Sequence, residues 1–316
     1  MNYQEMIREL AVPVAPSGFE TPVIDRLETL AREKGAQTSR TALGNLIAHR
    51  PGTGRKIALV AHVDSKGFVV LDKGENGFCR IGELGHTALA SVIGAPVRFA
   101  NCARGIIGCD GGAKAECKVT DLFINLTCGS VDLGDVCVVD LPGYADGNLI
   151  VSPALESRAG AAILLDVLAR TDSDADLYVV FSVQHELGER GAASALFDIQ
   201  PDAVIVCECL PASDIPCSSI KCSVKLGEGP VLPVKVGRGA ANPALIEKLE
   251  KAVAYPVQRA VYPDGLSDMT PIQVSGIGMY TCTAGIPVRT YGAMSIADVR
   301  DIGKTTELLL TALKTL

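Results

Sequence analysis

The sequence predicts an α/β fold in which a mixed sheet is sandwiched by helices and a small all-β domain is inserted between the two halves. After residue 152 apolar strands alternate with helical stretches, as in a sheet covered on both faces. From about residue 67 to residue 150 short β-type runs follow one another closely and are punctuated by glycine, which is typical of a compact β module. We therefore expect residues 1–66 and 151–316 to form one α/β domain around an inserted β-rich domain of residues 67–150.

The elements can be predicted in order along the chain. Residues 1–10 mix charges into an apolar helical pattern, and a turn at residues 16–18 precedes a second helix over about residues 22–33. A hairpin-like pair of strands ends at residues 57–61. Beyond the inserted module we expect strands at residues 177–183 and 203–206 and helices at residues 159–169, 191–197, 243–254 and 296–316.

Composition and charge narrow the class of protein. The 316 residues are 48% hydrophobic and 21% charged, with a formal net charge of -7, so neither a nucleic acid nor an anionic membrane is an expected partner. No apolar run is long enough to span a bilayer, and residues 1–10 lack the apolar core of a signal peptide. We expect a cytoplasmic protein whose 11 cysteines serve as small buried hydrophobic residues.

A histidine and an aspartate follow the apolar run at residues 57–61. His62 and Asp64 are two residues apart, so in an extended chain they share a face and the carboxylate can orient the imidazole for a metal ion. A polar pair at a strand end without any ligand fits the same spacing. His86 lies in the inserted module, where we expect a surface role, with approach to the site from a neighbouring subunit as the alternative.

Three glutamates occupy comparable places in the pattern. Glu186 follows the strand predicted at residues 177–183, and Glu208 follows the apolar run 203–206. Glu156 stands where a helix begins, and there an interaction with the helix dipole is the alternative role. Together with a histidine, these carboxylates form a nitrogen and oxygen ligand set suited to zinc, cobalt or manganese.

Nine segments, spread over almost the whole chain, carry a resemblance to a known family. They are residues 16–20, 43–48, 61–70, 154–160, 184–192, 201–216, 227–230, 267–268 and 286–289. In this order they resemble the motifs of the glutamyl and deblocking metallo-aminopeptidases, which include the tetrahedral aminopeptidases. The resemblance implies the zinc-aminopeptidase-like fold, two metal ions in the active site and assembly into homo-oligomers through the β-rich insert.

The resemblance also implies roles for individual residues. His62 and Glu208 would hold the first metal, Glu156 would bridge the two metals, and Glu186 would belong to the second metal. Asp64 would then be the partner that orients the histidine of the first metal.

This sequence departs from the family pattern at several of these positions. Glu156 and Glu208 stand where the family has aspartates, and Ser157 replaces the second aspartate of a DD pair. His185 stands at the position of the general-base glutamate, and residues 289–294 lack the last metal-binding histidine. We therefore expect one firmly bound divalent ion, zinc or cobalt with manganese as a further choice, rather than two. His185 is either the base or a replacement ligand.

Two functions fit this sequence. The first is a metal-dependent aminopeptidase-like hydrolase of altered site geometry that acts on peptides or small amides with a free N-terminus. It is favoured because the substituted acidic ligands remain acidic. The second is a catalytically inactive paralogue that keeps the fold for assembly or ligand binding. A glycosidase that uses the same carboxylates is disfavoured, because only 4% of residues are aromatic and none is tryptophan.

Overall fold

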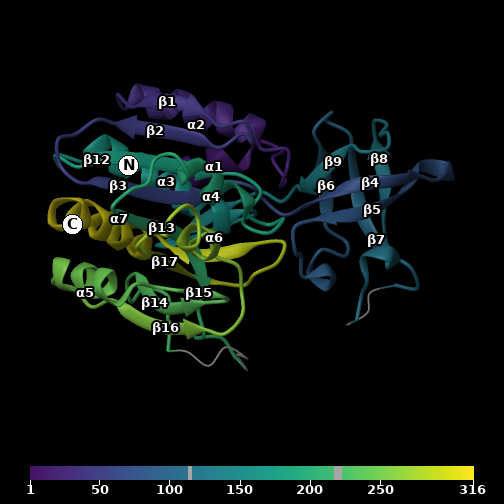
Figure 1. Cartoon of the computed structure of the whole chain (residues 1–316). Helices are drawn as coiled ribbons and strands as arrows, with labels where there is room; N and C mark the ends of the chain where they lie inside the picture. The colour runs from purple at the N-terminus through teal and green to yellow at the C-terminus, as the bar shows by residue number, and fades with distance from the viewer. Residues whose placement is uncertain (113–115, 217–222) are drawn as a thin grey trace.

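The computed structural model describes residues 1–112, 116–216 and 223–316 and has two parts (Figure 1). One part is a large mixed sheet with helices packed against it, and the other, on the right of Figure 1, is a small closed β-barrel. This is the α/β architecture with an inserted all-β module that the sequence predicts. Within the described ranges no helix combines the length and the apolarity that a bilayer crossing requires.

The large sheet has a parallel centre and antiparallel edges. Strands β12, β3, β13 and β17 run parallel to one another, which brings their C-terminal ends to one edge of the sheet. The order is β1 (Gln37–Arg40), β2 (Leu46–Arg50), β12 (Asp176–Ser182), β3 (Lys56–His62), β13 (Ala203–Pro211), β17 (Thr281–Arg289), β18 (Ser295–Asp298), β11 (Leu149–Ser152) and β10 (Tyr144–Asp146). β14 (Val231–Val236) pairs with β17, and β15 (Gly239–Ala240) and β16 (Gln258–Tyr262) pair with β14.

The pairing of β3 differs from the hairpin that the sequence predicts. β1 and β2 form an antiparallel hairpin, but β12 lies between β2 and β3, with Ser182 opposite His62. Residues 57–62 are all buried, so β3 is covered on both faces and pairs along both of its edges. The hairpin prediction was wrong for β3, because its two partners come from much later in the chain.

Seven α-helices occur within the described residues. They are α1 (Tyr3–Ala11), α2 (Thr21–Glu33), α3 (Leu155–Arg170), α4 (Arg190–Leu196), α5 (Pro243–Ala252), α6 (Met269–Gln273) and α7 (Val299–Thr315). Helix α3 contacts both β3 and β13 and is buried from Leu155 to Leu168, which explains why its middle, residues 159–165, is apolar all round. The core of this part includes Leu59, Ile163 and Phe181.

The start of the last helix corrects a second prediction. The helix expected from residue 296 begins at Val299, because Ser295–Asp298 form β18 and pair with β11 and β17. The side chain of Asp298 accepts a hydrogen bond from the backbone N–H of Arg300 and so caps the helix. The aspartate was the sequence signal for this boundary.

The barrel follows β3 directly and has its own core. Its strands close in the order β4 (Gly67–Lys73), β5 (Phe78–Leu84), β8 (Leu122–Cys128), β7 (Arg104–Cys109), β6 (Pro96–Phe99) and β9 (Val136–Val139). Phe68, Phe99 and Ile124 pack inside it. In the part of the barrel that the structure describes, three short 3₁₀ segments lie between its strands: η1 (Glu75–Gly77), η2 (Leu89–Ser91) and η3 (Val119–Asp121). Because β3 ends at His62 and β4 begins at Gly67, residues 63–66 join the two parts beside the C-terminal edge of the sheet.

Candidate functional site

Five of the six predicted site residues line one cavity of about 270 Å³ at the C-terminal edge of the parallel strands, and Asp64 is not among the lining residues. His62 ends β3, Glu208 lies in β13, and the loop after β12 carries His185 and Glu186. Glu156 enters from the first turn of α3. The cavity wall also includes Lys66, His86, Leu210, Val236, Tyr262, Asp264, Leu266 and Tyr291.

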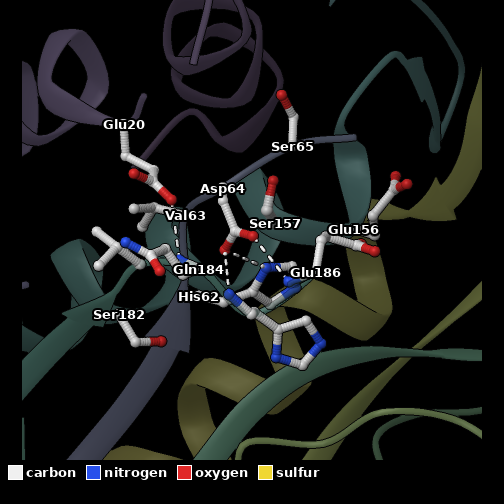
Figure 2. A network of polar contacts seen from close by, with 12 residues as sticks. Glu20, His62, Val63, Asp64, Ser65, Glu156, Ser157, Ser182, Gln184 and Glu186 are labelled. Carbon is white, nitrogen blue, oxygen red and sulfur yellow. Dashed lines mark hydrogen bonds and ion pairs between the residues drawn. The ribbon is translucent and has the colours of Figure 1, made fainter. Parts of the chain in front are cut away.

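Asp64 is the anchor of the loop that follows β12. Its side chain is fully buried and accepts hydrogen bonds from the backbone N–H groups of His185 (3.1 Å) and Glu186 (2.8 Å). Figure 2 shows Asp64 beside Glu186 and His62. Burial by itself would raise the pKa of Asp64, but His62, His185 and the Glu186 N–H bring it well below the usual range. Asp64 is therefore a buried carboxylate that holds the loop backbone in place.

Glu20 holds the same loop from the other side. It accepts the backbone N–H of Gly18 (2.8 Å) and the backbone N–H of Gln184 (2.9 Å), and Figure 2 shows the second contact. Gln184 has φ 55°, in the left-handed region, which costs backbone free energy that these contacts offset. The sequence prediction assigned no role to Glu20.

His62 lies against the ring of His185. The ring centroids are 4.0 Å apart, with an interplanar angle of 20°. Nδ1 of His62 is 3.4 Å from Oδ1 of Asp64 but outside hydrogen-bond geometry, and within the described residues this buried nitrogen has no hydrogen-bond partner. Asp64 is therefore near His62, as the spacing predicts, while its hydrogen bonds go to the loop.

His185 is paired with Asp268, a residue that received no role in the sequence prediction. Nδ1 of His185 lies 2.8 Å from Oδ1 of Asp268, whose Oδ2 accepts the Ser182 hydroxyl at 2.6 Å. Burial lowers the pKa of His185, but Asp268, Asp64 and Glu186 outweigh it and raise the pKa to about 10. His185 is therefore protonated at neutral pH, and its base role stays a prediction that requires the imidazole to lose this proton first.

Glu208 is buried among hydroxyl groups. Ser267 donates a hydrogen bond to its Oε1 at 2.6 Å, and Thr283 donates to the same oxygen at 3.3 Å. Burial is the main reason why the pKa of Glu208 rises to about 7. At neutral pH this carboxyl group is thus partly protonated.

Lys66 reaches the two remaining glutamates. Its Nζ lies 3.4 Å from Oε1 of Glu156 and 4.0 Å from Oε1 of Glu186. The other oxygen of Glu156 accepts the Ser295 hydroxyl at 3.3 Å. The sequence prediction assigned no role to Lys66, although it lies in the segment 61–70 that resembles a motif of the family.

The arrangement of these side chains can be compared with what a metal ion needs. Within the described residues no three or more His, Cys, Asp or Glu side chains form a group that could hold one ion. An ammonium group approaches the carboxylates of Glu156 and Glu186, and two hydroxyl groups hold Glu208. In this arrangement the residues do not fit the divalent ion that the sequence predicts.

The loop that follows β5 of the barrel packs against Glu186. Gly85 has φ 94°, and a Cβ atom at this position would lie 2.9 Å from Cβ of Glu186, so a glycine permits the close approach. The adjacent His86 is exposed and lines the cavity of its own chain. The barrel therefore contributes to the cavity without any second copy of the chain.

Comparison with known proteins gives the family. The model of the M42 glutamyl aminopeptidase family matches residues 44–308. A candidate aminopeptidase of Acetivibrio thermocellus is 29% identical over 329 residues, with 98% of each chain covered.

Solved structures agree with this match. An aminopeptidase from the archaeon Desulfurococcus kamchatkensis has a TM-score of 0.93 and 27% identity, covering 99% of this chain and 95% of its own. The TET1 peptidase of Pyrococcus horikoshii has a TM-score of 0.89 with all of both chains covered, and at 20% identity it shows the shared fold. These findings confirm the resemblance drawn from the motifs, and the chain belongs to the M42 glutamyl aminopeptidase family.

Proposed function

We propose that this protein binds the free N-terminal end of peptides or small amides in the cavity at the C-terminal edge of its sheet. The observation that carries the proposal is the convergence of His62, Glu156, Glu186 and Glu208 on one cavity in an aminopeptidase fold. It supports an aminopeptidase-like protein with an altered site.

The charges of the cavity suit an α-ammonium group. Glu156, Glu186 and Asp264 carry negative charge, whereas Lys66 and His185 carry positive charge, and Glu208 adds a further partly ionised carboxyl group. A ligand ammonium can therefore bind to the carboxylate of Glu186, whose Oε1 lies 4.0 Å from Nζ of Lys66, beyond hydrogen-bond distance. Leu210, Val236 and Leu266 line the cavity as well and can receive an apolar first side chain.

Of the two functions that the sequence suggests, this arrangement favours the ligand-binding paralogue. Metal-dependent hydrolysis requires His62, Glu156 and Glu208 to hold one zinc, cobalt or manganese ion, and the described residues offer no such group of ligands. Family membership favours the hydrolase, so the experiment below measures both ligand binding and metal-dependent turnover.

The test uses leucine amide and its N-acetyl derivative. We expect the free amine to bind in calorimetry at least ~10-fold more tightly than the acetylated form, and we expect Glu186→Gln to remove most of this difference. Equal binding of both compounds overturns the proposal. Turnover of aminoacyl chromophores that needs zinc or cobalt and stops with a chelator establishes the hydrolase instead.

We also propose that the protein is a cytoplasmic homo-oligomer and that the β-rich domain of residues 67–150 provides its subunit contacts. The support is the relative from Pyrococcus horikoshii, which can assemble into a tetrahedron or a large octahedral shell. Light scattering on the full chain measures the mass in solution, and a monomer at micromolar concentration contradicts the proposal.

A further inference from the structure

We propose that the ammonium group of Lys66 is a built-in cation that takes the place of a divalent metal between Glu156 and Glu186. The consequence is that this half of the cavity binds no metal until Lys66 is replaced. The proposal concerns the cavity in which we propose peptide binding, but it can be tested without any peptide.

The backbone around Lys66 is fixed on both sides. The N–H of Ser65 donates to the carbonyl of Ala15 at 3.1 Å, and the carbonyl of Ser65 accepts the N–H of Ser17 at 3.0 Å. At Gly67 a Cβ atom would lie 2.6 Å from Cβ of Pro16 and 2.7 Å from the carbonyl oxygen of Cys137. The start of β4 therefore has little freedom, and Lys66 has a defined starting point.

The side chain of Lys66 is directed into the cavity and largely enclosed. It is 17% exposed, and its Nζ lies 5.3 Å from the ring centroid of Tyr291, within the range of a cation–π contact. The hydroxyl of Tyr291 donates to the carbonyl of Cys209 at 2.7 Å, which fixes the ring. An aromatic face therefore holds the ammonium group beside the two carboxylates.

The two carboxylates are held as well. The Ser295 hydroxyl and the first turn of α3 position Glu156, whereas Glu186 is positioned by the bond from its N–H to Asp64 and by the close backbone of Gly85. The contact with Ser295 holds the carboxylate of Glu156, and the contacts of Glu186 fix the backbone position from which its side chain reaches toward Lys66. The three charged groups thus form one preformed set, which we call the rim triad: Lys66, Glu156 and Glu186.

A metal ion would compete directly with this ammonium group. Carboxylate oxygens bind zinc at ~2.0–2.2 Å, so an ion shared by these two glutamates would lie within a few ångströms of Nζ. Repulsion between like charges at such a distance in a partly buried site weakens metal binding by ~100-fold or more. The lysine also neutralises one of the two negative charges that would attract the ion.

The experiment measures metal binding rather than activity. Wild type, Lys66→Met and Lys66→Arg are stripped with a chelator and titrated with Co²⁺, whose visible absorption reports coordination, and with Zn²⁺ in equilibrium dialysis with metal analysis. We expect Lys66→Met to bind about one ion at least ~100-fold more tightly than wild type. Lys66→Arg keeps a cation and should remain like wild type.

Two controls complete the test. Lys73→Met makes the same change at an exposed ion pair with Asp132 and should leave metal binding unchanged. Lys66→Met combined with Glu186→Gln should lose the gained ion, which assigns it to the rim triad. Equal metal affinity of wild type and Lys66→Met overturns the proposal, as does failure of the folded Lys66→Met protein to gain an ion. If Lys66→Met does not fold by circular dichroism, Lys66→Gln takes its place under the same criteria.

Discussion

Two charged networks lie at the cavity and are held in different ways. The inner network consists of Asp64, His62, His185 and Asp268, whereas the rim triad consists of Lys66, Glu156 and Glu186. In the inner network each aspartate is almost completely buried and accepts backbone N–H groups or a hydroxyl group. In the rim triad Nζ of Lys66 lies 3.4 Å from Oε1 of Glu156 and 4.0 Å from Oε1 of Glu186. The difference indicates that the inner network maintains the fold of the site, while the rim triad sets the charge that a ligand meets.

The largest expected effect comes from Asp64→Asn. The amide removes a buried negative charge between two histidines and can accept at most one of the two loop N–H groups well. We expect a loss of ~3 kcal/mol in the free energy of unfolding, measured by urea denaturation. Asp72→Asn on the exposed part of β4 is the matched control, with a change within ~0.5 kcal/mol. A loss below ~1 kcal/mol for Asp64→Asn would contradict the inference that the inner network maintains the fold of the site.

Asp268→Asn should have the next largest effect. The substitution removes the charge that keeps His185 protonated, so the pKa of this histidine falls toward its ordinary value and stability decreases by ~2 kcal/mol. Proton NMR of the ring gives the pKa, and urea denaturation gives the stability. Asp176→Asn beside the half-buried His49 makes the same change outside the cavity and should cost less than ~1 kcal/mol. Equal effects at both positions would argue against a special inner network.

The sequence predicts the inner network better than the rim triad. An apolar strand followed by His62 and Asp64 is a local pattern, and parallel strand ends meet by the geometry of the sheet. The pairing of Lys66 with Glu156 and Glu186 depends on contacts across 90 and 120 residues, which no local pattern specifies. Asp268 lies in one of the motif segments, but its pairing with His185 could be recognised only from the folded structure.

The same reason explains the two errors in the fold. β12 enters between β2 and β3 from more than 110 residues away, which the apolar pattern at residues 57–61 cannot reveal. Residues 295–298 form a strand because β11 and β17 offer partners on both sides, although their local pattern continues into a helix. In each case long-range pairing decided the structure.

A buried carboxylate outside the cavity provides a reference for the inner network. Asp301 accepts the N–H groups of Gly227 (2.7 Å) and Gly229 (2.8 Å) but has no imidazole partner. Burial raises its pKa to about 6, whereas the histidines beside Asp64 keep the pKa of that residue low. The comparison indicates that the nearby cations, more than backbone bonds, offset the cost of burying a carboxylate.

This reference gives a pH prediction. Because the pKa of Asp301 is higher in the folded state than in the unfolded chain, the folded state binds the proton more tightly. Its contribution therefore stabilises the protein most below about pH 4 and is lost as the pH rises through about 6. From pH 4.5 to pH 7 we expect wild type to lose ~1–2 kcal/mol relative to Asp301→Asn in urea denaturation. A constant difference over this range contradicts the prediction.

The smallest effect is expected for Lys66→Met, measured as stability and not as metal binding. Its ammonium group lies 3.4 and 4.0 Å from the two glutamates, and because desolvation of these largely enclosed charges offsets much of their attraction, we expect a loss of less than ~1 kcal/mol. The methionine keeps the apolar stem against Tyr291, so packing changes little. Urea denaturation of Lys66→Met and Asp64→Asn under the same conditions compares the contribution of the rim triad to stability with that of the inner network. A loss above ~2 kcal/mol would place the rim triad with the inner network as part of the folded framework, since removal of a buried ion-pair partner has that magnitude.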